Sequence, residues 1–288
     1  MPAPAPTIKL SNGVEIPALG LGTWPIADAD AETVVAGAIQ AGYRLIDTAQ
    51  GYRNEEGIGK AMRASGVDRS EIFVMSKFNE RFHGYKEAQE AWAVSAERLG
   101  VDYIDMLLIH WPAPKQDRYV DAWRGMMKLL EDGKVRAIGT SNFKPAHLER
   151  LIAETSFTPH LNQVQINPRI PRQDHRDFDT AHGIVTEAWS PLSKGRDLLE
   201  EPSVVALSQK HSRTPGQVIL RWHVQNGLIP IPKSSNPGRL AENLSVFDFE
   251  LSPDDMHSLD ALDRHGEGAV DSDEYSGPVA KPAAQPQS

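Results

Sequence analysis

The sequence contains no cysteine, fewer basic than acidic residues, and no long hydrophobic run. Without cysteine there can be no disulfide framework, thiolate nucleophile, iron–sulfur cluster or thiolate zinc site. The 30 Lys and Arg residues against 39 Asp and Glu residues give a net charge of −9 at pH 7. This charge argues against a nucleic-acid partner and against binding to an anionic membrane surface, because both attract basic proteins.

Targeting and membrane signals are missing as well. The first residues, MPAPAPT, have no basic segment followed by an apolar one. No apolar run reaches the roughly 18 residues that a membrane-spanning helix needs. We therefore expect a cytoplasmic protein. With 288 residues, 40% of them hydrophobic, the chain can bury a large core.

Short apolar or β-branched runs alternate eight times with longer amphipathic stretches. Strands are expected at residues 19–23, 43–47, 72–76, 104–109, 135–139, 161–165, 184–188 and 228–231. Helices are expected between them, for example at residues 32–40, 55–62, 86–99 and 119–130, each ended by a glycine: Gly42, Gly66, Gly100 and Gly133. Eight such units predict a single (β/α)₈ barrel of the α/β class, because an open doubly wound sheet usually has fewer strands.

Composition also predicts the domain boundaries. We expect residues 1–6 to be disordered, residues 7–263 to form the barrel, and residues 264–288 to form a flexible, acidic and proline-rich tail unless it packs over the site. Asn12-Gly13 lies between two short alternating runs, and this pattern predicts a β-hairpin before the barrel.

The ends of the predicted strands carry the candidate catalytic residues, because working residues of such barrels lie where strands end. Asp47, Lys77 and His110 end three consecutive strands, and Tyr52 lies in the loop after the first of them. Each has an ordinary structural explanation when taken alone. Because neighbouring strands end in one mouth, we expect the three side chains to meet there, with Asp47 and Lys77 as a buried ion pair.

Such a pair can serve two kinds of chemistry. A neutral Lys77 could form a Schiff base with a carbonyl compound, as in aldolases. A charged Lys77 could instead lower the pKa of Tyr52 by about 1–3 units and make it a general acid for a carbonyl oxygen. His110 would then be a second hydrogen-bond donor to that oxygen. Carbonyl reduction also needs a hydride, which only a cofactor such as a nicotinamide can supply.

The last predicted unit carries a candidate phosphate site. Lys233, Ser234 and Arg239 gather at the start of a predicted helix, where backbone amides and two cations favour a phosphate such as the 2′-phosphate of NADP. The alternative is a capped, solvated start of a helix. Gly20-Leu-Gly22 is not a dinucleotide fingerprint, because Pro25 stands where the third glycine is needed.

Two further patterns concern metals and the pocket. No His-x-His or His-Glu-x-x-His pair occurs, so no metal is expected. Trp24, Trp111 and Trp189 fall at strand ends, where they can wall a pocket for an apolar carbonyl compound.

These segments together resemble the aldo-keto reductase family from Ile8 to Leu262. The motifs that carry the resemblance are Asp47-Thr-Ala-Gln-Gly-Tyr-Arg-Asn-Glu55, Ser76-Lys77, Leu108-Ile-His-Trp-Pro112, Gly139-Thr-Ser-Asn-Phe143, Asn162-Gln163, and Pro232-Lys-Ser-Ser with Glu242-Asn243. The resemblance implies an NADP(H)-dependent oxidoreductase that reduces an aldehyde or ketone. It implies the catalytic tetrad Asp47, Tyr52, Lys77 and His110.

The resemblance also implies the cofactor contacts, which are Ser141, Asn142, Gln163, Trp189, Ser190, Leu192, Lys233, Ser234, Arg239, Glu242 and Asn243. Trp189 would stack on the nicotinamide, as in microbial members that resemble diketo-gluconate reductases. We expect a monomer whose partner is a small carbonyl compound.

Two departures from the family pattern concern the substrate pocket, which we expect to include Trp24, Phe78 and Trp111. The run after Lys77, Phe-Asn-Glu-Arg-Phe, lacks the tryptophan of many relatives, so the pocket is expected to be wider or closed by Phe78 or Phe82. Gln165 and Asn167 stand where Glu and often His are usual.

The alternatives to a carbonyl reductase are a non-catalytic barrel that binds NADP(H) as a sensor, and a Schiff-base aldolase that uses Lys77.

Overall fold

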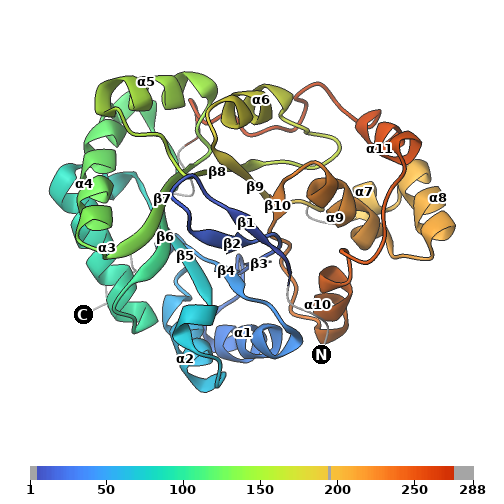
Figure 1. Ribbon diagram of the computed structural model, residues 1–288, viewed down its shortest axis with the longest axis horizontal. Helices are drawn as coiled ribbons and strands as arrows, with labels where there is room; N and C mark the ends of the chain where they lie inside the picture. Colours follow the sequence, from blue (N-terminus) through green and yellow to red (C-terminus); the bar gives the residue numbers. More distant parts are fainter. Residues whose placement is uncertain (1–4, 194–195, 276–288) are drawn as a thin grey trace, which may run out of the picture.

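The computed structural model describes residues 5–193 and 196–275. Within these residues, eight parallel strands form one sheet in which each strand pairs with the next along the chain. Figure 1 shows the strands at the centre of the molecule with helices around them. The strands are β3 (Leu21–Gly22), β4 (Leu45–Asp47), β5 (Phe73–Phe78), β6 (Ile104–Ile109), β7 (Val135–Ser141), β8 (Leu161–Gln165), β9 (Val185–Trp189) and β10 (Ile229–Pro230). The predicted barrel and its strands are confirmed.

Helices follow the strands as the periodicity predicted. They are α1 (Asp28–Ala41), α2 (Glu55–Ala64), α3 (Tyr85–Leu99), α4 (Tyr119–Glu131), α5 (Pro145–Thr155), α6 (Gln173–Ala181), α7 (Arg196–Leu199), α8 (Pro202–His211), α9 (Pro215–Gln225), α10 (Pro237–Leu244) and α11 (Pro253–Asp260). Gly42 and Gly100 end α1 and α3 in the left-handed conformation, with φ of 111° and 66°. No helix in the described ranges is long and apolar enough to cross a membrane.

Two glycines allow the first strand to approach the last one and close the barrel. The amide nitrogens of Gly20 and Gly22 donate to the carbonyl oxygens of Pro230 and Pro232, at 3.1 and 3.2 Å. A Cβ atom on Gly22 would lie 2.7 Å from the carbonyl oxygen of Ile231, closer than real Cβ contacts. The absence of a side chain at this position is therefore a condition for closure.

The predicted hairpin is present and covers one end of the barrel. It consists of β1 (Thr7–Lys9) and β2 (Glu15–Pro17), which pair antiparallel. Its turn is longer than a two-residue turn, because the amide nitrogen of Leu10 donates to the carbonyl oxygen of Val14, with Gly13 at φ 87° between them. Leu10 and Ile16 pack with the apolar side chains of the barrel interior, so the hairpin closes this end of the interior, which opens at the opposite, carboxyl end of the strands (Figure 1).

The two ends of the chain contact the barrel where the structure describes them. The carbonyl oxygen of Pro6 accepts a hydrogen bond from the amide nitrogen of Ala18 at 2.8 Å, whereas residues 1–4 lie outside the described ranges. At the other end, the amide nitrogen of Val270 donates to Gln165 Oε1 at 2.9 Å, and Arg172 donates to the carbonyl oxygen of Val270 at 2.7 Å. The tail therefore packs on the barrel.

Acidic side chains of residues 264–275 pair with cations on the barrel, which is the packed alternative that the sequence left open for the tail. Lys144 binds Asp271 at 2.6 Å and Asp273 at 2.5 Å, and His147 Nε2 lies 2.9 Å from Asp273. Tyr275 meets Trp111 edge to face, with ring centroids 4.7 Å apart. Residues 276–288, the rest of the predicted tail, lie outside the described ranges.

We expect Gly22→Ala to destabilise the protein by about 1–3 kcal/mol, because the new methyl group must displace backbone at the closure of the barrel. Gly37→Ala is the control, since nothing lies within 4 Å of a Cβ at that position of α1. This second change should raise the stability by about 0.5–1 kcal/mol. Urea unfolding of both variants measures the effects, and equal stabilities would refute this account of closure.

Candidate active site

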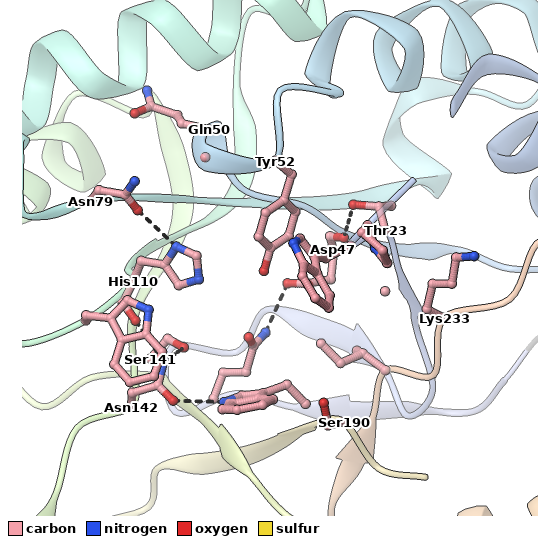
Figure 2. A pocket seen from close by; sticks show the side chains of 18 of the residues that line it. Thr23, Asp47, Gln50, Tyr52, Asn79, His110, Ser141, Asn142, Ser190 and Lys233 are labelled. Atoms are coloured by element: carbon pink, nitrogen blue, oxygen red, sulfur yellow. Dashed lines mark hydrogen bonds between the residues drawn. The ribbon is translucent and has the colours of Figure 1, made fainter. Parts of the chain in front are cut away.

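A cavity of about 1560 Å³ opens at the carboxyl ends of the strands. Figure 2 shows side chains from several different strands and loops pointing into it. The predicted site residues that line it are Trp24, Asp47, Tyr52, His110, Trp111, Ser141, Asn142, Gln163, Trp189, Ser190, Leu192, Lys233 and Arg239. The strand-end argument therefore placed most of the predicted site in one cavity.

Strand pleating decides which predicted residues face the interior. Along β5, Phe73 and Met75 belong to the interior cluster, so Lys77 points inward as well. Phe78 must then point outward; it is fully buried among the helices, with its ring 6.2 Å from that of His83. The prediction that Phe78 lines the substrate pocket is therefore wrong. Phe82, the other candidate to close the pocket, does not line the cavity either.

Asp47 and Lys77 form the predicted buried ion pair. Lys77 Nζ lies 2.6 Å from Asp47 Oδ1 and 3.0 Å from the carbonyl oxygen of Thr48, and the Lys77 side chain has no solvent exposure. Burial by itself would lower the pKa of Lys77, but the neighbouring Asp47 and Tyr52 raise it above its ordinary value. Lys77 is therefore a cation, and a protonated amine cannot attack a carbonyl carbon.

Tyr52 lies above this pair, on the short helix η1 (Gln50–Tyr52). Lys77 Nζ is 5.3 Å from the centre of its ring. Burial raises the pKa of Tyr52 more than Lys77 lowers it, so the net pKa lies above the ordinary value. The charge of Lys77 lowers the pKa of Tyr52 as predicted, but burial outweighs it. The prediction that the pKa of Tyr52 is lowered is therefore wrong.

His110 faces Tyr52 across the cavity, with ring centroids 5.7 Å apart (Figure 2). Burial, together with the charge of Lys77, holds the pKa of His110 well below its ordinary value, so the ring carries one proton. Its Nδ1 pairs with Asn79 Oδ1 at 3.1 Å. Asn79 therefore helps to fix which ring nitrogen is protonated. The sequence reasoning missed Asn79, although it follows Lys77 at the spacing of side chains on one face of a strand.

Asn142 ties the opposite wall of the cavity together. Its Nδ2 donates to the carbonyl oxygen of His110 at 2.9 Å and to Ser141 Oγ at 3.0 Å. Its Oδ1 accepts from Trp189 Nε1 at 2.8 Å, a contact that fixes the indole ring by its edge. The predicted neighbours Ser141, Asn142 and Trp189 thus form one connected unit.

Gln163 connects Asp47 to a residue that sequence reasoning missed. Its Nε2 donates to Asp47 Oδ1 at 3.0 Å and to Glu187 Oε2 at 2.5 Å. Glu187 comes two residues before Trp189 on β9, and this spacing could have placed it inside the barrel. Asn162 points the other way, where Thr140 Oγ1 donates to its Oδ1 at 3.0 Å.

The predicted phosphate site lies at the edge of the cavity. Lys233 and Arg239 are exposed and line it, whereas Ser234, Glu242 and Asn243 do not. The start of α10 is also capped, because Asn236 Oδ1 accepts from the amide nitrogen of Arg239 at 3.1 Å. The start of α10 is therefore capped, as in the alternative interpretation, and two exposed cations still line the cavity beside it.

Comparison with known proteins agrees with this geometry. The sequence model of the Aldo/keto reductase family matches residues 18–264. An aldo-keto reductase of Mycolicibacterium smegmatis is 47% identical over 259 residues, which are 90% of this chain and 94% of that protein. The glyoxal reductase of Bacillus subtilis is 46% identical over 90% of this chain and 93% of its own. The crystal structure of a mutant of Gox0644 in complex with NADPH has a TM-score of 0.89 and 42% identity, and the match covers 93% of this chain and 97% of that one.

We expect Lys77→Met to destabilise the protein by about 3–5 kcal/mol at pH 7, because Asp47 loses its buried partner and must take up a proton to remain buried. Without Lys77, burial raises the pKa of Asp47 further, so the folded state holds a proton that the unfolded chain has released. Stability is then lost as the pH rises through the acidic range. The destabilisation, measured by urea unfolding at pH 5 and pH 7, should be larger at pH 7, and a difference that does not change with pH would contradict this explanation.

Proposed function

The chain belongs to the aldo-keto reductase family, and we propose that it reduces the carbonyl group of a small aldehyde or ketone with NADPH, Tyr52 being the proton donor. One observation carries the proposal: the phenol of Tyr52 stands over a fully buried cation, Lys77, at the base of a large cavity. This combination suits the delivery of a proton to an oxygen that becomes negative.

The cavity fits a dinucleotide. Its volume of about 1560 Å³ exceeds the roughly 300–1,000 Å³ of ordinary small-molecule pockets. Polar side chains at the strand ends, Ser141, Asn142 and Gln163, suit a carboxamide, and the indole of Trp189 offers a flat wall for a ring. At the far edge, Lys233 and Arg239 suit a phosphate. NADPH-bound relatives such as Gox0644 support this assignment.

NADPH supplies the hydride when it is bound. The chain's own residues then act on the carbonyl oxygen. Tyr52 donates its proton, and the charge of Lys77 stabilises the phenolate that is left behind. Although burial raises the pKa of Tyr52, the transfer remains favourable because an alkoxide is a stronger base than a phenolate. His110, a neutral ring whose Nδ1 pairs with Asn79, lies opposite Tyr52 and confines the carbonyl group between the two rings.

The alternatives are less well supported. A Schiff-base aldolase needs a neutral Lys77, and the contact of 2.6 Å with Asp47 keeps the amine charged. A non-catalytic sensor would need no proton donor, whereas this chain has a complete tetrad. The glyoxal reductase among the relatives makes small dicarbonyl compounds the first substrates to test. Action as a monomer in the cytoplasm stays a prediction.

Tyr52→Phe should lower the rate of carbonyl reduction by about 10²-fold or more, because the ring remains and the proton is lost. Binding of NADPH, followed by fluorescence titration, should change little. Tyr85→Phe is the matched control: it removes an exposed hydroxyl group outside the residues that line the cavity and should leave the rate unchanged. A Tyr52→Phe protein that reduces glyoxal at the parent rate would show that Tyr52 is not the acid.

Arg239→Ala should weaken the binding of NADPH by about tenfold, because one charge-assisted bond to a phosphate is lost at an exposed position. The dissociation constant of NADH, which lacks the 2′-phosphate, should stay the same. Arg124→Ala on α4, an exposed arginine that is not among the residues lining the cavity, controls for the loss of a charge. Equal losses for NADPH and NADH would count against a 2′-phosphate contact.

A further inference from the structure

Glu187 is a carboxylic acid buried inside the barrel, below the proposed site of reaction. It lies on β9 and has no solvent exposure. Its Oε2 accepts a hydrogen bond from Gln163 Nε2 at 2.5 Å. Its Oε1 is buried and has no hydrogen-bond partner among the described residues. An ionised carboxylate in this place would leave one charged oxygen without solvation, so the surroundings favour the neutral acid.

The groups around Glu187 belong to the catalytic tetrad. The charges that act on it are Asp47 from β4 and Lys77 from β5, and Glu187 in turn acts on Tyr52 of η1. Burial, and to a smaller extent the charge of Asp47, raises the pKa of Glu187 to about 8, while Gln163 and Lys77 oppose the shift. At neutral pH the barrel interior therefore contains the balanced pair of Asp47 and Lys77 and a neutral Glu187.

We propose that Glu187 is a positioning residue that keeps its proton during catalysis, holds the amide of Gln163 against Asp47, and leaves Lys77 free to act on Tyr52. The inference rests on the proposed reductase function. Glu187 does not need to touch the substrate, because it acts through the hydrogen bonds of Gln163 and through its charge state.

Loss of the proton from Glu187 has a defined effect on Tyr52. A second negative charge in the interior raises the pKa of Tyr52 and of Lys77. Tyr52 then becomes a weaker acid, and the step that transfers its proton slows. A like charge nearby shifts a pKa by about one unit or more, so we expect the rate to fall about threefold to tenfold as the pH rises through the pKa of Glu187.

Stability provides a readout that does not depend on activity. The folded state holds a proton on Glu187 between the ordinary pKa of a glutamate and the raised one, whereas the unfolded chain does not. Stability from this group is therefore complete below the ordinary pKa of a glutamate, is lost as the pH rises from there to about 8, and changes no further above that pH. Glutamine in its place has no proton to lose, so the loss should disappear.

The test compares the full-length wild-type protein with Glu187→Gln, a change that keeps the shape and the acceptor oxygen for Gln163. Single-turnover reduction of glyoxal by the NADPH-loaded protein is measured from pH 6 to pH 9.5, and the melting temperature is measured over the same range. Asp179→Asn is the matched control. Asp179 is also a buried carboxyl group, with its pKa raised to about 7 by burial, but it faces Thr186, which donates to it at 2.9 Å on the outer side of β9.

We expect Glu187→Gln to react at close to the wild-type rate at pH 6.5 and to lose the alkaline fall, so that it exceeds the wild type by about threefold to tenfold at pH 9. The melting temperature of Glu187→Gln relative to that of the wild type should increase as the pH rises to about 8. Asp179→Asn should change the melting profile and keep the wild-type rate profile.

Identical rate profiles for Glu187→Gln and the wild type would overturn the positioning role. Identical melting profiles would overturn the held proton. A Glu187→Gln protein that is slow at every pH would show that the carboxyl group itself is needed, and this also contradicts the inference. If the wild type reduces no carbonyl compound, the proposed function fails, and the melting profiles still decide whether Glu187 holds a proton.

Discussion

A lysine and an aspartate that face each other in the barrel interior set the conditions for the rest of the site. Taking two ions out of water costs several kcal/mol each, and only close geometry with further hydrogen bonds offsets this cost. The chain supplies both: Lys77 lies 2.6 Å from Asp47 and also reaches the carbonyl oxygen of Thr48, while Gln163 donates to Asp47. Asp47 and Lys77 lie on the neighbouring strands β4 and β5, whereas Gln163 comes from β8, so this third contact requires the curved sheet of the barrel.

The buried ion pair in turn constrains the other polar groups of the barrel interior. Once the interior holds one balanced pair, each additional polar group there must be neutral or well bonded. His110 meets this condition as a neutral ring paired with Asn79. Asn142 meets it by bonding three neighbours at once. The resulting network leaves the cavity with few alternative arrangements, and such preorganised donors stabilise developing charge best.

The sequence predicted the strands and the residues at their ends, because these follow from hydrophobic periodicity and position in the chain. It did not predict features that depend on how deeply a side chain is buried or on contacts between distant segments. Hydrophobic periods located the strands, and the rule about strand ends brought Asp47, Lys77 and His110 together. Phe78 was assigned to the pocket because the run after Lys77 lacks the tryptophan of many relatives, although Phe78 and Lys77, as neighbours on one strand, must face opposite sides. The predicted lowering of the pKa of Tyr52 was wrong because the sequence does not reveal how deeply a side chain is buried. The ionic contacts of residues 264–275 join segments far apart in the chain, which no local pattern indicates.

The packing of residues 264–275 separates two properties that many enzymes encode in the same residues. Val270 and Tyr275 form part of the cavity wall, yet this segment contributes no strand to the barrel and is held mainly at its surface. Substitutions there can reshape the wall without disturbing the core that folds the chain. New substrate preferences can therefore arise during evolution, or in the laboratory, at little expense to stability.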